Sequence, residues 1–477
     1  MKWNILTSMS FLFILFAAVY GFQRAQEPGY IGIDFVQFHL TGRHVVNGGD
    51  SHVYSDKTRR EILERVCNDA TSEGTESKFY HAVNFRHVRT WETYSSPFLY
   101  AVFGATAGQS SERNRESRER YEIALRRFWI VCLVATMIGF ITFGWVLRIP
   151  AWSMLFGAAC LAWFSPLRID MNVANVNQIQ FGMVGVLAAI LSGRWKLTDR
   201  AGVGCESGHA NRGAHHAERD EYIGGHFIAG VWLGLCLAFK PSLLWCGVMW
   251  LGPMIWVAIQ SREFRACFSK LLIAAIVGGV LGATIAVAFS AIWFPLHCWI
   301  EWIQVVGSLP DEIIQTEQGN YSLTYFARSH GIPAWSLAMV GPVLGRGLSF
   351  IEGRRLFSRA IETSLETRST EIAECQAIGC LIHMLTSNLV WYHYGMLSLP
   401  AMIVMLRRVV TSTSRAEATL LGGILLWCLL LIGLQPTDEI ITSPPNEHFL
   451  RCTIANVLLL ILVVITTRDR LISNVSR

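Results

Sequence analysis

The chain of 477 residues contains several long apolar runs without a single charge. Two of them read LLIAAIVGGVLGATIAVAFSAIWF, at 271–294, and CTIANVLLLILVVITT, at 452–467. A helix needs about 20 apolar residues to cross a membrane, and the runs lack the alternation of membrane barrel strands. Charged residues make up only 16% of the chain, less than in soluble domains. The sequence therefore predicts an all-α, polytopic membrane protein.

Hydropathy divides the chain into about 12 predicted transmembrane helices. They are 4–22, 94–108, 128–147, 177–193, 225–239, 241–259, 271–293, 335–349, 376–391, 394–406, 418–435 and 450–467. Another apolar segment, 151–164, is short and bracketed by Pro150 and Pro166, so we expect a re-entrant or half helix there. Residues 4–22 are alternatively a cleaved signal peptide, although no clear cleavage site follows them.

The loops between these segments differ in their content of Lys and Arg. Basic-rich stretches are 109–127, 194–222, 261–270, 350–374, 407–417 and the tail after Thr467. In contrast, 436–449 has no Lys or Arg, and 295–334 has only Arg328. Since cytoplasmic loops are the basic ones, both termini are expected in the cytoplasm, with a long outer loop over 23–93. The net charge of +5 therefore reflects loop asymmetry and does not indicate nucleic acid.

We expect one integral membrane domain over 1–477. The histidines of GHANRGAHHAERDE, inside the basic stretch 194–222, are spaced so that they could chelate a metal. Surrounded by Gly, Asn and charges, they are more typical of a flexible cytoplasmic insertion. The 12 cysteines form no CxxC pair, so neither a disulfide framework nor a zinc site is predicted.

Asp34 is the first polar group that packing does not explain. It follows the first apolar segment and stands in the aromatic context YIGIDFVQFHL. A solvated acid at a helix end is the simpler interpretation. However, an unpaired carboxylate next to a bilayer is costly, which favours a functional role. A carboxylate there could act as a general base toward an attacking hydroxyl.

Three cationic or ionisable groups are predicted on the same outer face as Asp34. Lys240 interrupts an apolar stretch before Pro241, and it either snorkels or binds a phosphate. Arg328 is the one basic residue of its loop and is either an interface anchor or a second phosphate ligand. His393, in VWYHYG, belongs to an aromatic belt or donates to a phosphate oxygen.

Amide side chains are concentrated where the predicted helix 177–193 begins. Five of them fall within nine residues, namely Asn172, Asn175, Asn177, Gln178 and Gln180. Helix capping needs one or two of them. The others are suited to a ligand rich in hydroxyl groups.

The order of these motifs resembles glycosyltransferase family 87, the polyprenyl-phosphate-mannose-dependent alpha-1,2-mannosyltransferase-like proteins of the GT-C superfamily. The resemblance runs from Asp34 to Pro400. The motifs that carry it are VVNGGDSHVYSD, YSSPFLYAVFGA, NVNQIQFGMVGVLAAIL, AGVWLGLCLAFKPSLLW, GNYSLTYFARSHG and SNLVWYHYGMLSLP. The chain departs from the family pattern where Asn177 replaces a Gly, Gln180 replaces an Asn, and Tyr394 replaces a second His.

The resemblance implies a GT-C-like fold and an inverting transfer of a hexose, with mannose the first candidate. The donor would be a polyprenyl-phosphate sugar and the acceptor a lipid or glycan hydroxyl, at the outer face of the plasma (inner) membrane. Asp34 would be the catalytic base. Lys240, Arg328 and His393 would bind the donor phosphate. Sugar and acceptor contacts are expected from Asn177, Gln178, Gln180, Asn320 and Trp391.

The resemblance implies neither a cofactor nor a metal, and the predicted outer loops agree, since they contain no DxD pair or Gly-rich phosphate loop. The partners would be the donor, the acceptor and membrane lipids. A multi-pass transporter of a polar or lipid-linked solute is the main alternative, although the sequence shows no clear inverted repeat. A scaffold derived from the same family is a third possibility.

Overall fold

The computed structural model of the chain describes residues 31–85, 91, 93–107, 117–162, 164–193, 211–260, 262–307, 322–323, 330–333, 339–359, 365–387, 390–433 and 445–475. Within these ranges the chain is helical and contains no β-strand, which confirms the all-α prediction for this part of the protein. The predicted first span, 4–22, and the site candidates Asn320 and Arg328 lie outside the described residues.

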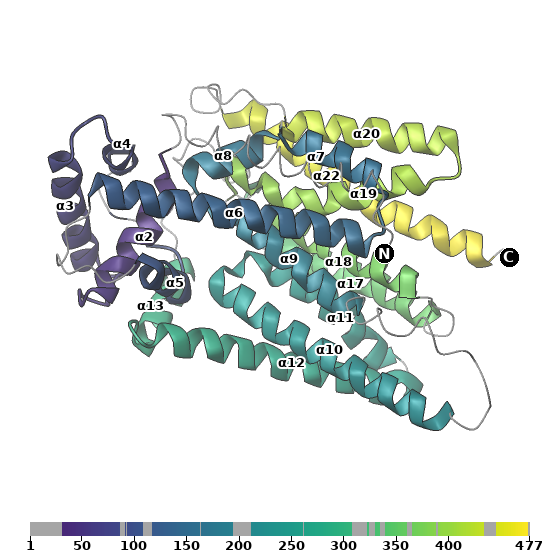
Figure 1. Cartoon of the computed structure of the whole chain (residues 1–477). Helices are drawn as coiled ribbons and strands as arrows, with labels where there is room; N and C mark the ends of the chain where they lie inside the picture. Colours follow the sequence, from purple (N-terminus) through teal and green to yellow (C-terminus); the bar gives the residue numbers. More distant parts are fainter. Residues whose placement is uncertain are drawn as a thin grey trace.

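The helices form one elongated bundle with a cap of shorter helices at one end (Figure 1). The cap and the first half of the bundle comprise α2 (Ile33–Val46), α3 (Asp56–Ser72), α4 (Lys78–Phe85), α5 (Pro97–Ala107), α6 (Arg118–Val146), α7 (Ala151–Ala162), α8 (Ser165–Val173), α9 (Asn177–Ser192) and α10 (Asn211–Phe239). The rest comprises η2 (Pro241–Leu243), α11 (Leu244–Gln260), α12 (Arg262–Ser290), α13 (Leu296–Gly307), α17 (Val340–Arg359), α18 (Leu365–Thr386), η3 (Tyr392–Ser398), α19 (Leu399–Thr411), α20 (Arg415–Gly433) and α22 (Pro445–Val475).

Five helical segments are long and apolar enough to cross a membrane, or six if the bent pair α8 and α9 counts as one span. The five are Arg118–Val146, Pro241–Gln260, Arg265–Ser290, Tyr392–Thr411 and Arg415–Gly433. The other predicted spans that fall within the described residues lie on helices that are shorter or carry more charge, so twelve crossings are not confirmed and the GT-C fold stays a prediction. The composition and length of the helices are consistent with a membrane protein.

Large apolar side chains on the outer faces of α6 and α12 are exposed. On α12, Ile273, Val277 and Val280 are 59%, 53% and 62% exposed. On α6, Ile130 and Val131 are 50% and 53% exposed. Such a continuous apolar surface is unfavourable in water but matches the hydrocarbon of a bilayer.

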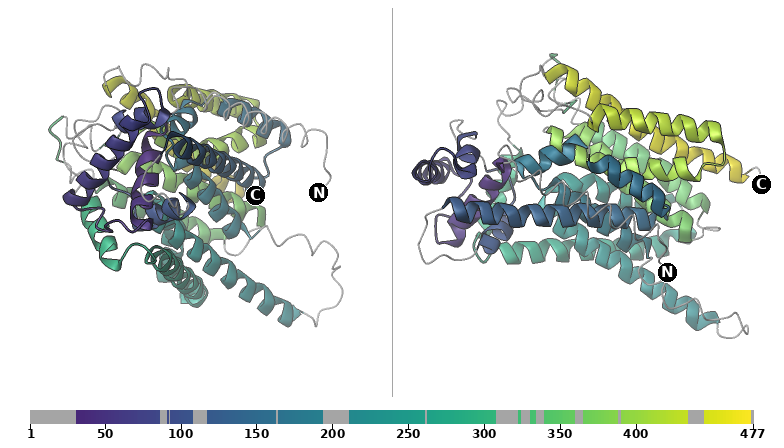
Figure 2. Two further views of the ribbon diagram at one scale, coloured as in Figure 1. Left: turned by 60° about the vertical axis from the view of Figure 1, so that its left-hand side comes forward. Right: turned by 45° about the horizontal axis from the view of Figure 1, so that its top comes forward.

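Helices α10 and α12 pack backbone to backbone through glycines four residues apart. A Cβ on Gly230 or Gly234 would lie 2.1 or 2.2 Å from a carbonyl oxygen of α12. A Cβ on Gly278 or Gly282 would lie 2.2 or 2.1 Å from a carbonyl oxygen of α10. Small residues at this spacing let membrane helices approach closely. The two helices lie side by side along much of their length (Figure 2).

The prediction that 94–108 crosses the membrane is wrong. Helix α5 has 11 residues and is about 16 Å long, roughly half a bilayer core. Its Gly104 packs against Gly42 of α2, where a Cβ would meet the Gly42 carbonyl oxygen at 2.6 Å. The start of α6 is also at this end of the bundle, because the Tyr121 hydroxyl donates to the carbonyl of Gly32 at 3.0 Å. The chain therefore stays at one end from α2 to α6.

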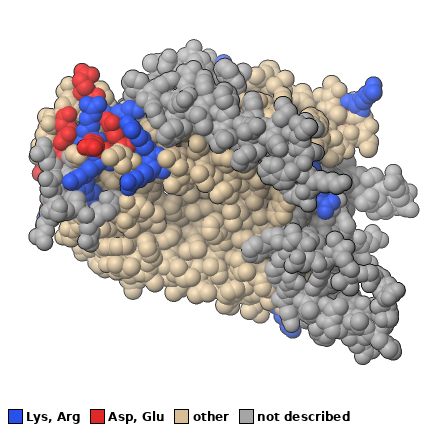
Figure 3. Space-filling view, viewed as in Figure 1, with Lys and Arg blue, Asp and Glu red and all other residues tan. Residues whose placement is uncertain are grey.

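The basic stretch 109–127, of which residues 117–127 are described, therefore lies at a different end of the bundle than expected. These residues lie beside the predicted outer loop instead of at the opposite end, and the Arg118 backbone N–H donates to Glu73 at 3.2 Å. Their charge is partly balanced locally, since Arg118 pairs with Glu122 at 3.0 Å. Figure 3 shows the mixed basic and acidic patch over this end of the molecule.

Of the two forms expected for 151–164, the structure has a half helix, α7, and not a re-entrant loop. Met154 of α7 contacts Gly144 near the end of α6, whereas the carbonyl of Met171 in α8 accepts a hydrogen bond from Trp129. Gly144 and Trp129 are about 22 Å apart along the axis of α6. Helices α7 and α8 therefore carry the chain back along α6, and the sharp break follows at 174–176, where α8 and α9 are bent by 118°.

Other predicted loops also become helix. Residues 211–222 of the predicted insertion form the first turns of α10. At 407–417 the helix α19 continues to Thr411, so Arg408 is a buried helical residue instead of a loop residue. Its guanidinium pairs with Glu374 of α18 at 2.7 Å and donates to the carbonyls of Leu462 and Val463 in α22. This buried ion pair joins three helices.

Candidate functional site

The candidate site lies where two hydrophobic cores meet. One core is built around α2, α5 and the first half of α6, and it includes Met171 and Val176. The other is built around α9, α18 and α19, and it includes Tyr392 and Tyr394. Polar side chains from α2, the break between α8 and α9, the end of α10 and η3 converge at this boundary.

Asp34 is placed in the first turn of α2 by the residue that starts the helix. Gly32 has a φ of 76°, a left-handed conformation that favours glycine, and its N–H donates to the carbonyl of Asn172 at 2.9 Å. A Cβ there would also meet Leu125 at 2.7 Å. The turn fixes the Asp34 carboxylate against α8, and the residue is only 8% exposed.

Asn175 lies in the break between α8 and α9 and contacts the acid directly. Its side-chain amide donates to Asp34 Oδ2 at 2.6 Å. The break is held open by Ala174, which has a φ of 55°, and by the N–H of Asn175, which donates to the carbonyl of Asp170 at 3.1 Å. The Asn175 carbonyl oxygen of the side chain accepts from the N–H of Val176 at 2.7 Å, which fixes the orientation of the amide.

Lys240 contacts the same side chain, Asn175, from the end of α10. It follows α10 in extended conformation, and Pro241 starts the next helical turn. Its ammonium donates to the side-chain oxygens of Asn175 and Asn177, both at 3.3 Å, and lies 4.4 Å from the centroid of the Tyr394 ring. Asn175 therefore bridges the Asp34 carboxylate and the Lys240 ammonium.

His393 completes the group. It lies in η3 and is 6% exposed, and its Nε2 is 3.8 Å from Asp34 Oδ2. The turn is pressed against α8, because a Cβ on Gly395 would lie 2.8 Å from the Pro166 side chain. The predicted residues Asp34, Asn177, Lys240 and His393 thus belong to one cluster, although they are far apart in the sequence.

Asp170 is a member of the cluster that the sequence reasoning missed. It is fully buried, accepts from the Asn177 amide at 2.8 Å, and accepts from the N–H of Gln178 at 3.3 Å. It therefore caps the start of α9 and orients Asn177 toward Lys240. A carboxylate between two apolar stretches, in SPLRIDMNVANVNQIQ, was the signal available in the sequence.

The other predicted ligand contacts are less direct. Gln178 accepts from the Thr136 hydroxyl of α6 at 2.9 Å, and Gln180 donates to the Ser242 hydroxyl. Both glutamines are buried and tie α9 to its neighbours, but Gln178 Nε2 and Gln180 Oε1 have no hydrogen-bond partner among the described residues. Trp391 directly precedes η3 and is partly buried against the second core.

The cluster can hold an ionised carboxylate beside a cation in a largely dry environment. The amide of Asn175 stabilises the charged form of Asp34 by a hydrogen bond, and the ammonium lies on the far side of the same amide. This arrangement suits either base catalysis or the binding of a polar ligand. No family model, curated protein or solved structure matches the chain.

Proposed function

We propose that the chain is a membrane glycosyltransferase that transfers a hexose from a polyprenyl-phosphate sugar to a lipid or glycan hydroxyl. Mannose is the first candidate, because of the family resemblance in the sequence. The observation that supports this proposal best is the cluster of buried Asp34, Asn175 and His393 with the partly buried Lys240, at one end of a bundle of apolar helices. A carboxylate and two nitrogen donors are the groups such a transfer requires.

In the proposed reaction the acceptor oxygen attacks the anomeric carbon while Asp34 takes the hydroxyl proton. The bond from that carbon to the phosphate oxygen breaks, and the lipid phosphate leaves with the electron pair, so the configuration inverts. General base catalysis of this kind is worth about 10²–10⁴ in rate. The proton on Asp34 is returned to solvent or to the departing phosphate.

Lys240 and His393 would stabilise the charge that develops on the phosphate. Lys240 is a point charge held over the Tyr394 ring and by two amide oxygens, so its ammonium is oriented before the donor arrives. His393 lies 3.8 Å from the acid and, when protonated, keeps Asp34 in the carboxylate form that a base requires. Arg328 and Asn320 keep their expected roles in phosphate and acceptor binding as part of this proposal.

An apolar cavity whose wall includes residues that flank α8 and η3 supports a lipid-linked donor. It has a volume of about 280 Å³ and is lined only by apolar residues of α6, α7, α19 and α20, together with Phe164. Phe164 directly precedes α8, and Leu399, also at the cavity wall, directly follows η3. A prenyl chain in this cavity would bring the attached phosphate toward the elements that carry Asp170 and His393.

The distribution of basic residues supports an outer-face site in the plasma membrane. The helix ends that border 194–222, 261–270 and 407–417 lie at the end of the bundle away from α2 (Figure 1). The positive-inside rule favours a cytoplasmic position for that end, and in this proposal Asp34 would lie on the other side. The arginines at the start of α6 are the exception, and they are interleaved with acids.

The test is to incubate the purified chain in lipid nanodiscs with polyprenyl-phosphate mannose, glucose and N-acetylglucosamine, together with extracted membrane lipids and glycans. Mass spectrometry should detect a hexose-extended product with one donor, and the Asp34→Asn variant should form none. If no donor is consumed by the wild-type chain, or if both chains consume it equally, the proposal is wrong.

Transport of a polar or lipid-linked solute is the second candidate function. The observation in its favour is the break at 174–176, where polar residues line the junction of two helices bent by 118°. Transporters bind substrates at such interrupted helices. In proteoliposomes a transporter would accumulate labelled solute or flip labelled lipid without forming a product, whereas the transferase would form product without accumulating the solute.

A further inference from the structure

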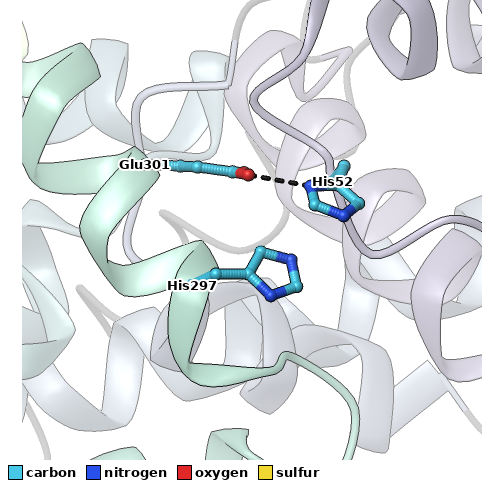
Figure 4. Close-up of side chains that lie close together, drawn as sticks. All are labelled: His52, His297 and Glu301. Carbon is cyan, nitrogen blue, oxygen red and sulfur yellow. Dashed lines mark hydrogen bonds and ion pairs between the residues drawn. The ribbon is translucent and has the colours of Figure 1, made fainter.

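A second polar group lies at the same end of the molecule and outside the candidate site. It consists of His52, from the segment after α2, together with His297 and Glu301 of α13 (Figure 4). The three residues each offer one ligand atom, and these atoms all lie within 4.8 Å of one another. Of the described residues, these form the one group of three or more His, Cys, Asp or Glu with this property.

The spacing of the two residues on α13 matches that of a metal site. His297 and Glu301 are four residues apart, so their side chains lie on the same face of the helix, one turn apart. His52 comes from a distant part of the chain, and its Nδ1 is 2.8 Å from Glu301 Oε1 across a separation of 249 residues. The rings of His52 and His297 are 4.2 Å apart between centroids. All three side chains therefore point into one small space (Figure 4).

Two polar atoms of this group have no hydrogen-bond partner in the part of the chain that the structure describes. His297 Nε2 and Glu301 Oε2 are buried and have no hydrogen-bond partner among the described residues. A buried polar atom without a partner costs about 1–3 kcal/mol, so these atoms require a further partner, such as a water molecule or an ion. The hydrogen bond between His52 and Glu301 does not involve His297 Nε2 or Glu301 Oε2, so both atoms could still coordinate an ion.

We propose that His52, His297 and Glu301 bind a divalent transition metal ion, with Zn²⁺ the best match. Two histidines and one glutamate are a known zinc ligand set, which leaves one position for water or another ligand. Tetrahedral coordination places ligand atoms about 3.3 Å apart, which small changes of side-chain rotamer can achieve from the present positions. Histidine binds a metal ion in its neutral form and glutamate binds it as the carboxylate, so binding weakens as the pH falls.

The ion would join the segment after α2 to α13. Asp34 lies in the first turn of α2 and His52 follows the last turn of this helix, so we assign the ion a structural role and no role in the proposed reaction. Its effect would be to hold the cap of the molecule together across two distant parts of the chain. The Cys298 thiol already docks this segment by donating to the carbonyl of Ser51 at 3.2 Å, which is a contact independent of the metal.

The experiment measures metal binding by the full chain, purified without a polyhistidine tag, stripped with chelator and kept in detergent. Zn²⁺ is titrated against a chromophoric chelator, and Co²⁺ absorption reports the coordination. We expect one ion per chain and an increase of the melting temperature with Zn²⁺. His297→Ala and Glu301→Gln should each weaken binding by at least about ten-fold, since loss of supporting residues alone costs that much.

Two control variants separate metal binding by this group from the neighbouring thiol contact and from binding elsewhere in the chain. Cys298→Ala removes the thiol contact but no ligand, so its Zn²⁺ affinity should stay within about three-fold of the wild type, well short of the loss of a ligand. His215→Ala/His216→Ala alters the other histidine-rich stretch and should leave the ion bound. Absence of Zn²⁺ binding by the wild-type chain, or equal binding by wild type and His297→Ala, would overturn the proposal.

Discussion

The side-chain amide of Asn175 donates to the carboxylate of Asp34 at 2.6 Å, although 141 residues separate the two. The same side chain accepts from the Lys240 ammonium at 3.3 Å. Asn175 therefore joins an acid and a cation without letting them form a direct ion pair among the contacts described. A bound phosphate or hydroxyl can then interact with either group, which a closed Asp–Lys pair would hinder.

Replacing Lys240 by Ala should mainly weaken use of the sugar donor. The ammonium is the phosphate ligand in the proposed reaction, so the variant should raise the donor KM or lower the turnover by about ten-fold or more. Initial rates at varied donor concentration measure this. Lys240→Arg keeps the charge and serves as the matched control. An unchanged KM and turnover for Lys240→Ala would mean that the lysine only snorkels at the helix end.

The glycine packing of α10 against α12 predicts opposite effects for the same substitution at two sites. Gly234→Ala puts a Cβ 2.2 Å from the carbonyl oxygen of Gly279, so the helices must move apart at a cost of about 1–3 kcal/mol. Gly224 is on the same helix with nothing within 4 Å, and Gly224→Ala should be neutral or slightly stabilising. Melting temperatures in detergent compare the two, and equal values would contradict this packing.

Replacing one partner of the buried Arg408–Glu374 pair should lower the free energy of unfolding more than replacing both partners. Arg408→Met leaves the Glu374 carboxylate uncompensated, with a loss of about 3–5 kcal/mol in the free energy of unfolding. Arg408→Met/Glu374→Met removes both charges and should recover most of that loss. Denaturation of the single and double variants measures the difference. A double variant less stable than Arg408→Met would contradict the expected cost of a buried charge without its partner.

Two buried histidines of α2 predict that the cap loses stability in acid. Burial, and then Arg65, lower the pKa of His44 to about 4, whereas burial, and then Arg43, lower the pKa of His39 to about 3. The ordinary value is about 6.5, so below that pH the unfolded chain binds protons that the folded chain does not. Stability is therefore full above about pH 7 and falls as the pH drops from about 6.5 toward 4.

The variant His44→Gln should reduce this pH dependence, because it removes one of the two groups. Thermal unfolding between about pH 7 and pH 4.5 measures the effect. His81 is exposed on α4, so His81→Gln is the control and should follow the wild type. A His44→Gln variant with the same decline as the wild type would show that other groups cause it.

Much of the fold was predictable from apolar runs, because a helix that crosses a bilayer needs a minimum length without charge. The sequence therefore predicted the five long apolar helices closely. It failed at 94–108, because a short helix can also be apolar when it packs against α2 through Gly42 and Gly104. At 151–164 the half helix was expected, but the sequence did not show that α7 and α8 together carry the chain back along α6.

For the site, the sequence suggested most of the residues, but not which side chains contact one another. Asp34, Lys240 and His393 were predicted individually from their apolar contexts, and the structure brings them into one cluster. Asp170 was missed because nothing in the local pattern shows that it caps α9 and orients Asn177. The His52 group was equally invisible, since His52 and Glu301 are 249 residues apart.

The most direct test of the proposed function is the rate of sugar transfer from polyprenyl-phosphate mannose by the Asp34→Asn variant, which keeps the shape of the side chain and removes the base. Asp56→Asn, at an acid that is largely exposed in α3, is the matched control. The proposal predicts a loss of about 10²-fold or more for Asp34→Asn with an unchanged melting temperature, and wild-type rates for Asp56→Asn. Wild-type transfer by a folded Asp34→Asn protein would contradict it.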